Sequence, residues 1–171
     1  SEPVPGLTIA AIPERADPRD VLVASGDRTL AQLPAGARVG TSSQRRVALL
    51  NALRPDLEAI EIRGNVDTRI QKVMDGEADA VLLAASGLDR LGRLSEATQL
   101  FRAMEFLPAP GQGALGVQCR SDDDDTLRLL AALDHAETRA AVTAERGLLA
   151  ALGTGCSLPV GAYATVTGDL L

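Results

Sequence analysis

Aromatic residues and histidine are almost absent from this 171-residue chain. Aromatics make up 2% of the sequence with no tryptophan, so the core must be aliphatic and base stacking offers little for binding single-stranded nucleic acid. The net charge of −6 also argues against a general polyanion binder. His135 is the only histidine, so no histidine-based metal cluster can form, and we expect it to be a surface helix residue. We therefore expect neither nucleic acid nor a metal as a partner.

Long apolar runs and a cysteine framework are missing as well. No segment approaches the ~20 apolar residues that a membrane-spanning helix needs, and no secretory signal is visible. Two cysteines, Cys119 and Cys156, fit a reducing compartment better than a disulfide-rich secreted fold. We therefore predict a cytoplasmic protein without a membrane partner.

Lysine is nearly absent too. Sixteen of the 17 basic residues are arginine, and Lys72 is the only lysine. The codon bias of a GC-rich genome explains most of this skew. Arginine nevertheless holds carboxylates in a fixed bidentate geometry, so the positions of the arginines matter more than their number.

Residues 38–85 show alternating strand and helix patterns. Strands are expected over 38–40, 57–62 and 80–85, and helices over 44–53 and 65–75. This order is typical of an α/β fold with right-handed crossovers. The continuous apolar run at 80–85 is typical of a strand buried on both faces of a parallel sheet.

The flanking regions carry weaker patterns. Strands are expected over 8–12, 21–24, 114–119 and 163–166, and helices from the acidic run 122–125 and over 136–151. Residues 108–113 (PAPGQG) are interpreted as a hinge or crossover. Glu145 and Arg146 are interpreted as a structural pair within a helix, and Cys119 as a buried strand residue.

Three strand-to-helix junctions carry arginine: residues 40–46 (GTSSQRR), 63–69 (RGNVDTR) and 86–90 (SGLDR). Parallel strands present their carboxyl ends at one edge of a sheet, where ligands bind in open α/β folds. A capping serine with surface arginines would explain any single junction. Together the junctions predict an anionic ligand with several carboxylates or phosphates.

Cys156 lies in a glycine-flanked run at 153–161 (GTGCSLPVG). Glycines leave little bulk around the sulfur, and accessible cysteines are kept for reactivity more often than for packing. From these residues alone, a small apolar residue in a tight turn is an equal alternative.

Four motifs, at 40–46, 63–69, 110–114 (PGQGA) and 155–161, resemble the hydroxymethylbilane synthase family, also called porphobilinogen deaminase. The resemblance implies a periplasmic-binding-protein-like α/β domain followed by the start of a small α+β C-terminal domain. It also implies a transferase of haem biosynthesis. Such an enzyme deaminates four porphobilinogen units and joins them on a covalently bound dipyrromethane primer, giving the linear tetrapyrrole hydroxymethylbilane.

The resemblance also implies roles for individual residues. Cys156 would attach the dipyrromethane through a thioether. The remaining cofactor-binding residues would be Thr41, Ser43, Arg45, Arg46, Leu83, Ala84 and Gly87. The residues contacting cofactor or incoming porphobilinogen would be Arg63, Arg69 and Arg90. Asp67 stands where some members have glycine, and its carboxylate would weaken anion binding unless it points away as a helix N-cap.

By the same resemblance, the catalytic aspartate belongs to a His-Ser-x-Lys-Asp motif expected immediately before Ser1. We therefore expect a segment that is inactive alone, from a protein that is monomeric when complete. Its expected parts are 1–12 (end of domain 1), 13–107 (domain 2), 108–120 (return strand to domain 1) and 121–171 (helical linker and truncated start of domain 3, carrying the cofactor cysteine).

Two other hypotheses remain open. A periplasmic-type binding module for a small anion would explain the arginines but not the glycine-flanked thiol. The second of these hypotheses is that the chain is an inactive, purely structural relative.

Overall fold

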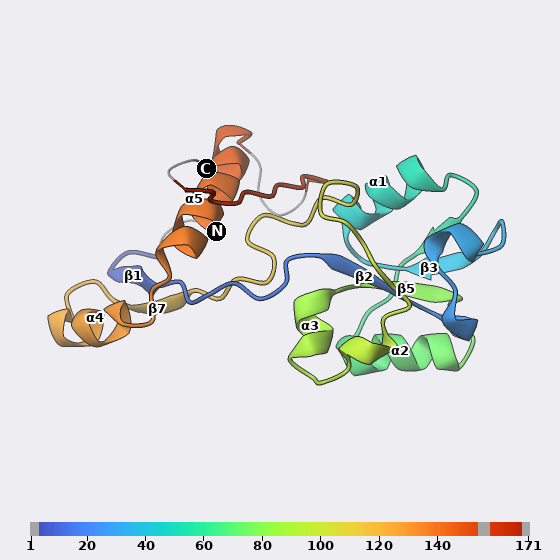
Figure 1. The fold of residues 1–171 in the computed structure, drawn as a ribbon, viewed down its shortest axis with the longest axis horizontal. Coiled ribbons are helices and arrows are strands. Elements are labelled where there is room, and N and C mark those ends of the chain that lie inside the picture. The colour runs from blue at the N-terminus through green and yellow to red at the C-terminus, as the bar shows by residue number, and fades with distance from the viewer. Residues whose placement is uncertain (1–3, 154–157, 169–171) are drawn as a thin grey trace.

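The computed structural model describes residues 4–153 and 158–168. Its larger part is a five-stranded sheet covered by helices (Figure 1). The strand order is β4 (Glu58–Ile60), β3 (Arg38–Gly40), β5 (Ala80–Ala84), β2 (Asp20–Ala24), β6 (Gln99–Leu100). β3 pairs in parallel with β4 and β5, whereas β2 runs antiparallel to β5 and β6. The expected α/β fold is confirmed, but the sheet is mixed rather than parallel.

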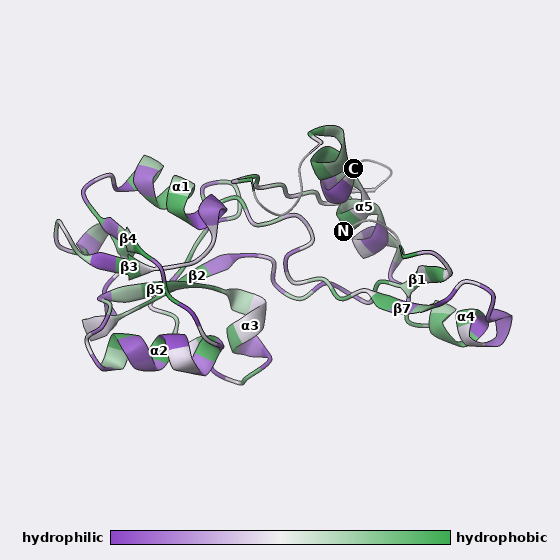
Figure 2. Cartoon of the chain, turned by 180° about the vertical axis from the view of Figure 1, so that it is seen from behind, coloured by the Kyte–Doolittle hydropathy of each residue, from purple (hydrophilic) through white to green (hydrophobic). Residues whose placement is uncertain are grey.

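Helices cover both faces of this sheet. Figure 1 shows α1 (Gln44–Leu53) on one face and α2 (Val66–Met74) with α3 (Ala85–Asp89) on the other. Because side chains alternate along a strand, β5 sends Leu82 into the core under α1 and Leu83 into the core under α2. The apolar run at 80–85 is thus buried on both faces, as expected. In Figure 2, β5 is largely hydrophobic while α1 and α2 mix hydrophobic and hydrophilic turns.

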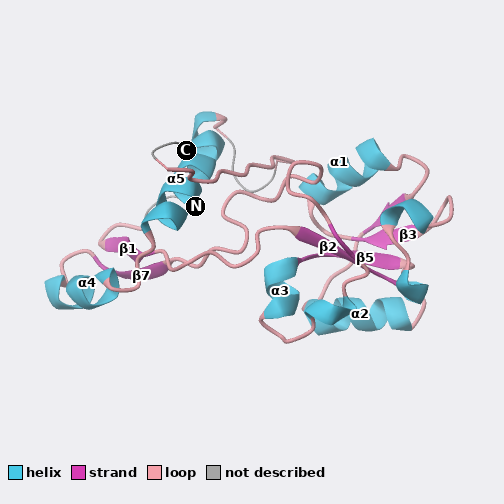
Figure 3. Cartoon of the chain, in the orientation of Figure 1, coloured by secondary structure: helices cyan, strands magenta, loops and turns pink. Residues whose placement is uncertain are grey.

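The second part is a two-stranded antiparallel sheet of β1 (Leu7–Ala11) and β7 (Val117–Arg120), with α4 (Asp124–Ala131) and α5 (Ala136–Ala151). Long segments without regular structure connect it to the larger sheet (Figure 3). Short 3-10 helices are η1 (Ser25–Asp27), η2 (Leu30–Gln32) and η3 (Leu94–Glu96). Among the described residues, no helix has the length and hydropathy to cross a membrane.

Several local expectations are refined at this second part. The acidic run opens α4 as expected, with the Asp123 carboxylate accepting from the Thr126 N–H at 3.0 Å. His135 is the N-cap of α5, where its Nδ1 accepts from the Thr138 N–H at 3.3 Å. Cys119 is half-buried in β7 rather than fully buried.

Glu145 of α5 joins four chain segments. Its carboxylate accepts from the Arg15 guanidinium at 2.7 and 3.1 Å, from the Gly111 N–H at 2.6 Å and from the Ala164 N–H at 2.9 Å. The Glu145 side chain is 1% exposed, and Arg15 also stacks over the Tyr163 ring at 5.6 Å. This buried charge is therefore fully paired, as a carboxylate in a protein interior must be.

Two sequence expectations are wrong here, and Glu145 explains both. Its ion-pair partner is Arg15, distant in sequence, and Arg146 is exposed. Residues 163–166 are not a strand, because the Ala164 N–H donates to the Glu145 carboxylate instead of to a neighbouring strand. In the described region only Thr167 makes a β-bridge there.

Substitution Glu145→Gln should lower the free energy of unfolding by about 3–5 kcal/mol, because it leaves the Arg15 guanidinium without its carboxylate. Urea denaturation of the purified protein measures this loss. The neighbouring Arg146→Gln is the control and should change stability by less than about 0.5 kcal/mol. Equal losses in the two variants would contradict the assignment of Arg15 as the partner.

Candidate functional site

The carboxyl ends of β4, β3 and β5 lie side by side at one edge of the large sheet. β3 leads into α1, β4 into α2 and β5 into α3. This topology brings the three arginine-bearing junctions to the same edge. Ligands of open α/β sheets bind in this region.

At the junction between β3 and α1, the backbone packs closely against the chain that follows β4. A Cβ on Gly40 would lie 3.0 Å from the Ile62 side chain, so glycine lets the neighbouring strand ends pack closely. The buried Thr41 hydroxyl accepts from the Ser43 N–H at 3.2 Å. Ser43 in turn caps α1 by accepting from the Arg46 N–H at 3.4 Å. Both predicted hydroxyl residues therefore shape the start of α1.

Asp20, at the start of β2, is the counter-ion of both arginines at the start of α1. Arg46 donates to Asp20 Oδ1 from Nη2 at 2.7 Å and from Nε at 3.0 Å. Arg45 donates to Asp20 Oδ2 at 2.7 Å. Asp20 is 0% exposed, and the two arginines are 5% and 9% exposed. One carboxylate thus balances two buried guanidiniums, and the cluster keeps one positive charge in excess.

Arg45 makes several contacts besides its ion pair with Asp20, but its Nε donates no hydrogen bond within the described part of the chain. Its Nη1 also donates to the Leu107 carbonyl, and its Nη2 to Gln112 Oε1 at 3.3 Å. Its guanidinium lies 5.9 Å from the Phe106 ring centroid. Arg45 Nε is buried and has no hydrogen-bond partner in the described part of the chain. A buried donor without a partner costs free energy, which an added acceptor would recover.

Gln112 completes the cluster from the crossover segment. Its amide nitrogen donates to the Pro18 carbonyl at 2.6 Å and to Asp20 Oδ1 at 3.1 Å. The neighbouring Gly113 has φ +84°, and a Cβ there would lie 2.6 Å from the Ala16 carbonyl oxygen. The two crossover segments therefore run in close contact beside the arginines.

Burial is the largest influence on the pKa of Arg46. Burial lowers the pKa of Arg46, Asp20 opposes this change, and the positive charges of Arg45 and Arg69 add to it. The positive charge of Arg69, from the second junction, thus acts on the pKa of Arg46 in the same direction as that of Arg45.

The remaining predicted arginines point to different partners. Arg69 is half-buried and its Nε donates to the Gly64 carbonyl at 2.8 Å. Arg63, with a side chain 85% exposed, pairs with Glu61 at 2.8 Å. Arg90 is exposed and donates to the Gly113 carbonyl at 3.1 Å. The structure thus joins Arg45 and Arg46 in one cluster, while Arg63 and Arg90 make contacts of their own.

The predicted apolar residues lie on or after β5. Leu83 is 3% exposed within the core, whereas Ala84 is half-buried and pairs across the sheet with Asp20. Gly87 lies in α3, where an added Cβ would be 3.6 Å from the Val66 side chain at the start of α2. These residues therefore border the same edge.

A pocket of about 210 Å³ opens beside the Arg45 cluster. Its walls come from the start of α1, the crossover, α5 and the part of the cysteine motif that follows Cys156; they are Ser42, Ser43, Gln44, Arg45, Ala109, Pro110, Leu149, Leu158 and Val160. Cys156 itself lies outside the described residues. Leu158 and Val160 follow it closely in sequence, so the pocket has walls from both the arginine motif and the cysteine motif.

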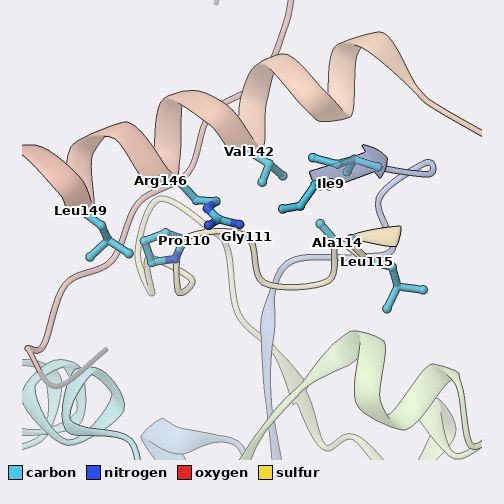
Figure 4. A pocket seen from close by; sticks show the side chains of 10 residues that line it. Ile9, Pro110, Gly111, Ala114, Leu115, Val142, Arg146 and Leu149 are labelled. Carbon is cyan, nitrogen blue, oxygen red and sulfur yellow. The ribbon is translucent and has the colours of Figure 1, made fainter. Parts of the chain in front are cut away.

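A second pocket, of about 260 Å³, lies between β1, the crossover and α5. Figure 4 shows its walls of Ile9, Pro110, Ala114, Leu115 and Val142, with Arg146 reaching across from the helix. None of the predicted site residues lines it. It shares Pro110 and Leu149 with the pocket beside Arg45, so the two pockets adjoin.

Sequence reasoning missed Asp20 and Gln112. Asp20 reads as the end of a charged loop, although a carboxylate directly before a fully apolar strand is a signal of a buried ion pair. Gln112 belongs to the expected hinge and to the 110–114 motif, but neither indicates its contact with Asp20. Asp67 was considered as an N-cap, but Asn65 caps α2 and Asp67 lies in the first turn, paired with Arg93.

Taken together, the sheet topology and the buried charge define an α/β protein with a cationic site at the carboxyl edge of its sheet. Comparison with known families identifies the family to which this α/β protein belongs. Residues 1–128 match the family model described as "Porphobilinogen deaminase, dipyromethane cofactor binding domain". Residues 139–171 match "Porphobilinogen deaminase, C-terminal domain".

Curated relatives agree. The chain is 55% identical over 167 residues to a porphobilinogen deaminase of Roseiflexus sp. (strain RS-1), covering 98% of this chain and 55% of that protein. It is 58% identical over 168 residues to the Thermobifida fusca (strain YX) enzyme, covering 98% of this chain and 52% of that protein. The chain belongs to the porphobilinogen deaminase family. It spans about half the length of the curated relatives it matches.

Solved structures are more distant. A periplasmic substrate-binding protein of an ABC transporter from Coxiella burnetii aligns with a TM-score of 0.49 and 15% identity, over 84% of this chain and 67% of that one. Similarity at this level carries no functional conclusion.

Replacing Asp20 by Asn should lower the free energy of unfolding by about 3–5 kcal/mol, because two buried guanidiniums would lose the carboxylate that they share. Chemical denaturation monitored by far-UV circular dichroism measures the loss. The exposed Asp89→Asn serves as control and should change stability by less than about 0.5 kcal/mol. A stability unchanged from wild type would show that the cluster does not depend on Asp20.

Proposed function

We propose that this chain forms part of an enzyme that joins four porphobilinogen units into hydroxymethylbilane on a covalent dipyrromethane cofactor. One observation carries the proposal beyond family membership. Within residues 4–153 and 158–168 the buried Arg45 Nε has no hydrogen-bond partner, and it lies beside a pocket with walls from both the arginine motif and the chain following Cys156. A carboxylated ligand tethered at Cys156 would supply the missing acceptor.

The residues present fit a dipyrromethane. Its rings carry acetate and propionate groups, and the cluster of Arg45, Arg46 and Asp20 has one positive charge in excess. The first turn of α1 adds backbone N–H donors and the positive end of the helix dipole. When bound, this cofactor would supply the free pyrrole α-carbon to which new units are added.

The chain's own residues would bind and orient. Arg45 and Arg46 would hold carboxylates while Asp20 keeps their side chains in place. Thr41 and Ser43 would fix the start of α1, and Leu83, Ala84 and Gly87 would border the site. The residues proposed to contact cofactor or incoming porphobilinogen are Arg63, Arg69 and Arg90. They are exposed or half-buried and have room to change partners.

The wider context is proposed on the same basis. Residues 13–107 would form the second domain, 1–12 and 108–120 the strands of the first domain, and 121–171 the entry into the third. The antiparallel pairing of β1 with β7 supports this assignment. We further propose a cytoplasmic enzyme that is monomeric when complete.

The complete protein should have an intact mass that exceeds its sequence by two pyrrole units, because Cys156 would carry the cofactor through a thioether. Electrospray mass spectrometry measures this excess. Cys156→Ser should lose it, whereas Cys119→Ser should retain it. An unmodified thiol in catalytically active protein would refute the proposal. Reversible anion binding without turnover would favour a binding module instead.

The 171-residue chain, purified free of any longer form, should not convert porphobilinogen into tetrapyrrole. No aspartate in it matches the catalytic motif that the family places before this segment. Absorbance of the oxidised product measures turnover, with a full-length relative as the positive control. Sustained product formation by the chain alone would overturn this expectation.

A further inference from the structure

Asp67 places a carboxylate between two arginines of the proposed anion site. It lies in the first turn of α2, two positions before Arg69, and its side chain is 58% exposed. A negative charge at this place repels an anionic ligand and partly cancels the helix dipole. Unless another group neutralises the Asp67 carboxylate, it therefore weakens anion binding at this junction.

Arg93, in the turn after α3, provides the neutralising contact. Its Nη1 donates to Asp67 Oδ1, and the Arg93 side chain is 30% exposed. The other side of the same guanidinium is held by Glu96 of η3, from Nε to Oε1 at 2.6 Å and from Nη2 to Oε2 at 2.7 Å. Glu96 therefore binds a different edge of the guanidinium from Asp67 and leaves Nη1 to Asp67.

The surrounding backbone keeps this contact in register. Gly87 of α3 packs close to Val66, the residue before Asp67. The Arg93 N–H donates to the Leu88 carbonyl at 2.9 Å, which anchors the turn to α3. The start of α2 therefore lies close to α3, and the turn that follows α3 brings Arg93 to Asp67.

We propose that Arg93 is a positioning residue that neutralises Asp67 and so keeps the α2 junction favourable for carboxylate ligands. The proposal rests on the proposed function, since it concerns the affinity of that same site. Arg93 acts through Asp67 and makes no contact with the ligand itself. Its effect is electrostatic, so it depends on the presence of the Asp67 charge.

The test uses the complete protein and a non-reactive probe. The probe is a pyrrole that carries the acetate and propionate groups but no aminomethyl group, so it cannot lose ammonia. Isothermal titration calorimetry measures its Kd. Arg93→Gln should weaken binding about five-fold, because it leaves Asp67 and Glu96 without their shared counter-ion near a dianion in a solvated site. The weakening should shrink in high salt.

Rescue separates charge from structure. In the double variant Asp67→Asn with Arg93→Gln, Kd should return to within about two-fold of wild type, because the Asp67 charge is gone while Glu96 is left without Arg93 in both variants. Glu96→Gln breaks one of the two ion pairs of Arg93 but leaves Asp67 neutralised, so it should bind like wild type. Arg102→Gln, which removes the exposed pair with Glu105, is the matched surface control.

Each outcome decides the proposal. Unchanged affinity in Arg93→Gln would overturn it, and so would a double variant as weak as Arg93→Gln, because Arg93 would then act through packing. Loss in Glu96→Gln equal to that in Arg93→Gln would also overturn it. If wild type binds the probe, these results leave the proposed function standing. No binding by wild type would overturn both.

Discussion

A single buried carboxylate balancing two buried guanidiniums is the interaction on which this molecule's site depends. Asp20 opens β2, which runs antiparallel to β5, and pairs with Arg45 and Arg46 of α1. Removing charges from water costs several kcal/mol per ion, which only close pairing offsets. Here the pairing is incomplete by one positive charge. The fold thus fixes the start of α1 and leaves it with a preference for a further anion.

The same charges also tie the two parts of the chain together. Arg45 and Gln112 connect the large sheet to the crossover, and Gln112 also accepts from Arg15 through its carbonyl at 2.9 Å. Arg15 is the partner of Glu145, which holds α5 and the Gly111 backbone. An unbroken series of hydrogen bonds therefore runs from the arginine motif to the helix that precedes the cysteine motif. The relative placement of those two motifs depends on buried polar groups rather than on apolar packing alone.

The sequence could predict the local features of the fold. The bounds of α1 and α5 follow from helical spacing and capping residues, and the α/β order from alternating patterns. The direction of β2 could not be inferred, because an apolar run is the same whether its neighbour is parallel or antiparallel. Asp20 lies 25 residues from Arg45, so only the folded chain reveals their pairing. The expected strand at 163–166 failed for the same reason, since Glu145 takes the Ala164 N–H. The motifs indicated where a ligand would bind, but not which charges are already paired there.

The scarcity of lysine takes on a physical meaning at these buried positions. Burial lowers the pKa of Arg46, yet a guanidinium begins so high that it keeps its charge, whereas a buried ammonium loses its proton far more readily. Arg45 also reaches Asp20, the Leu107 carbonyl and Gln112 from one planar group, which a lysine ammonium on its flexible stem does not match. On the surface either cation would serve. At Arg45 and Arg46, permanent charge and fixed geometry are what allow two guanidiniums to share one carboxylate inside a protein core.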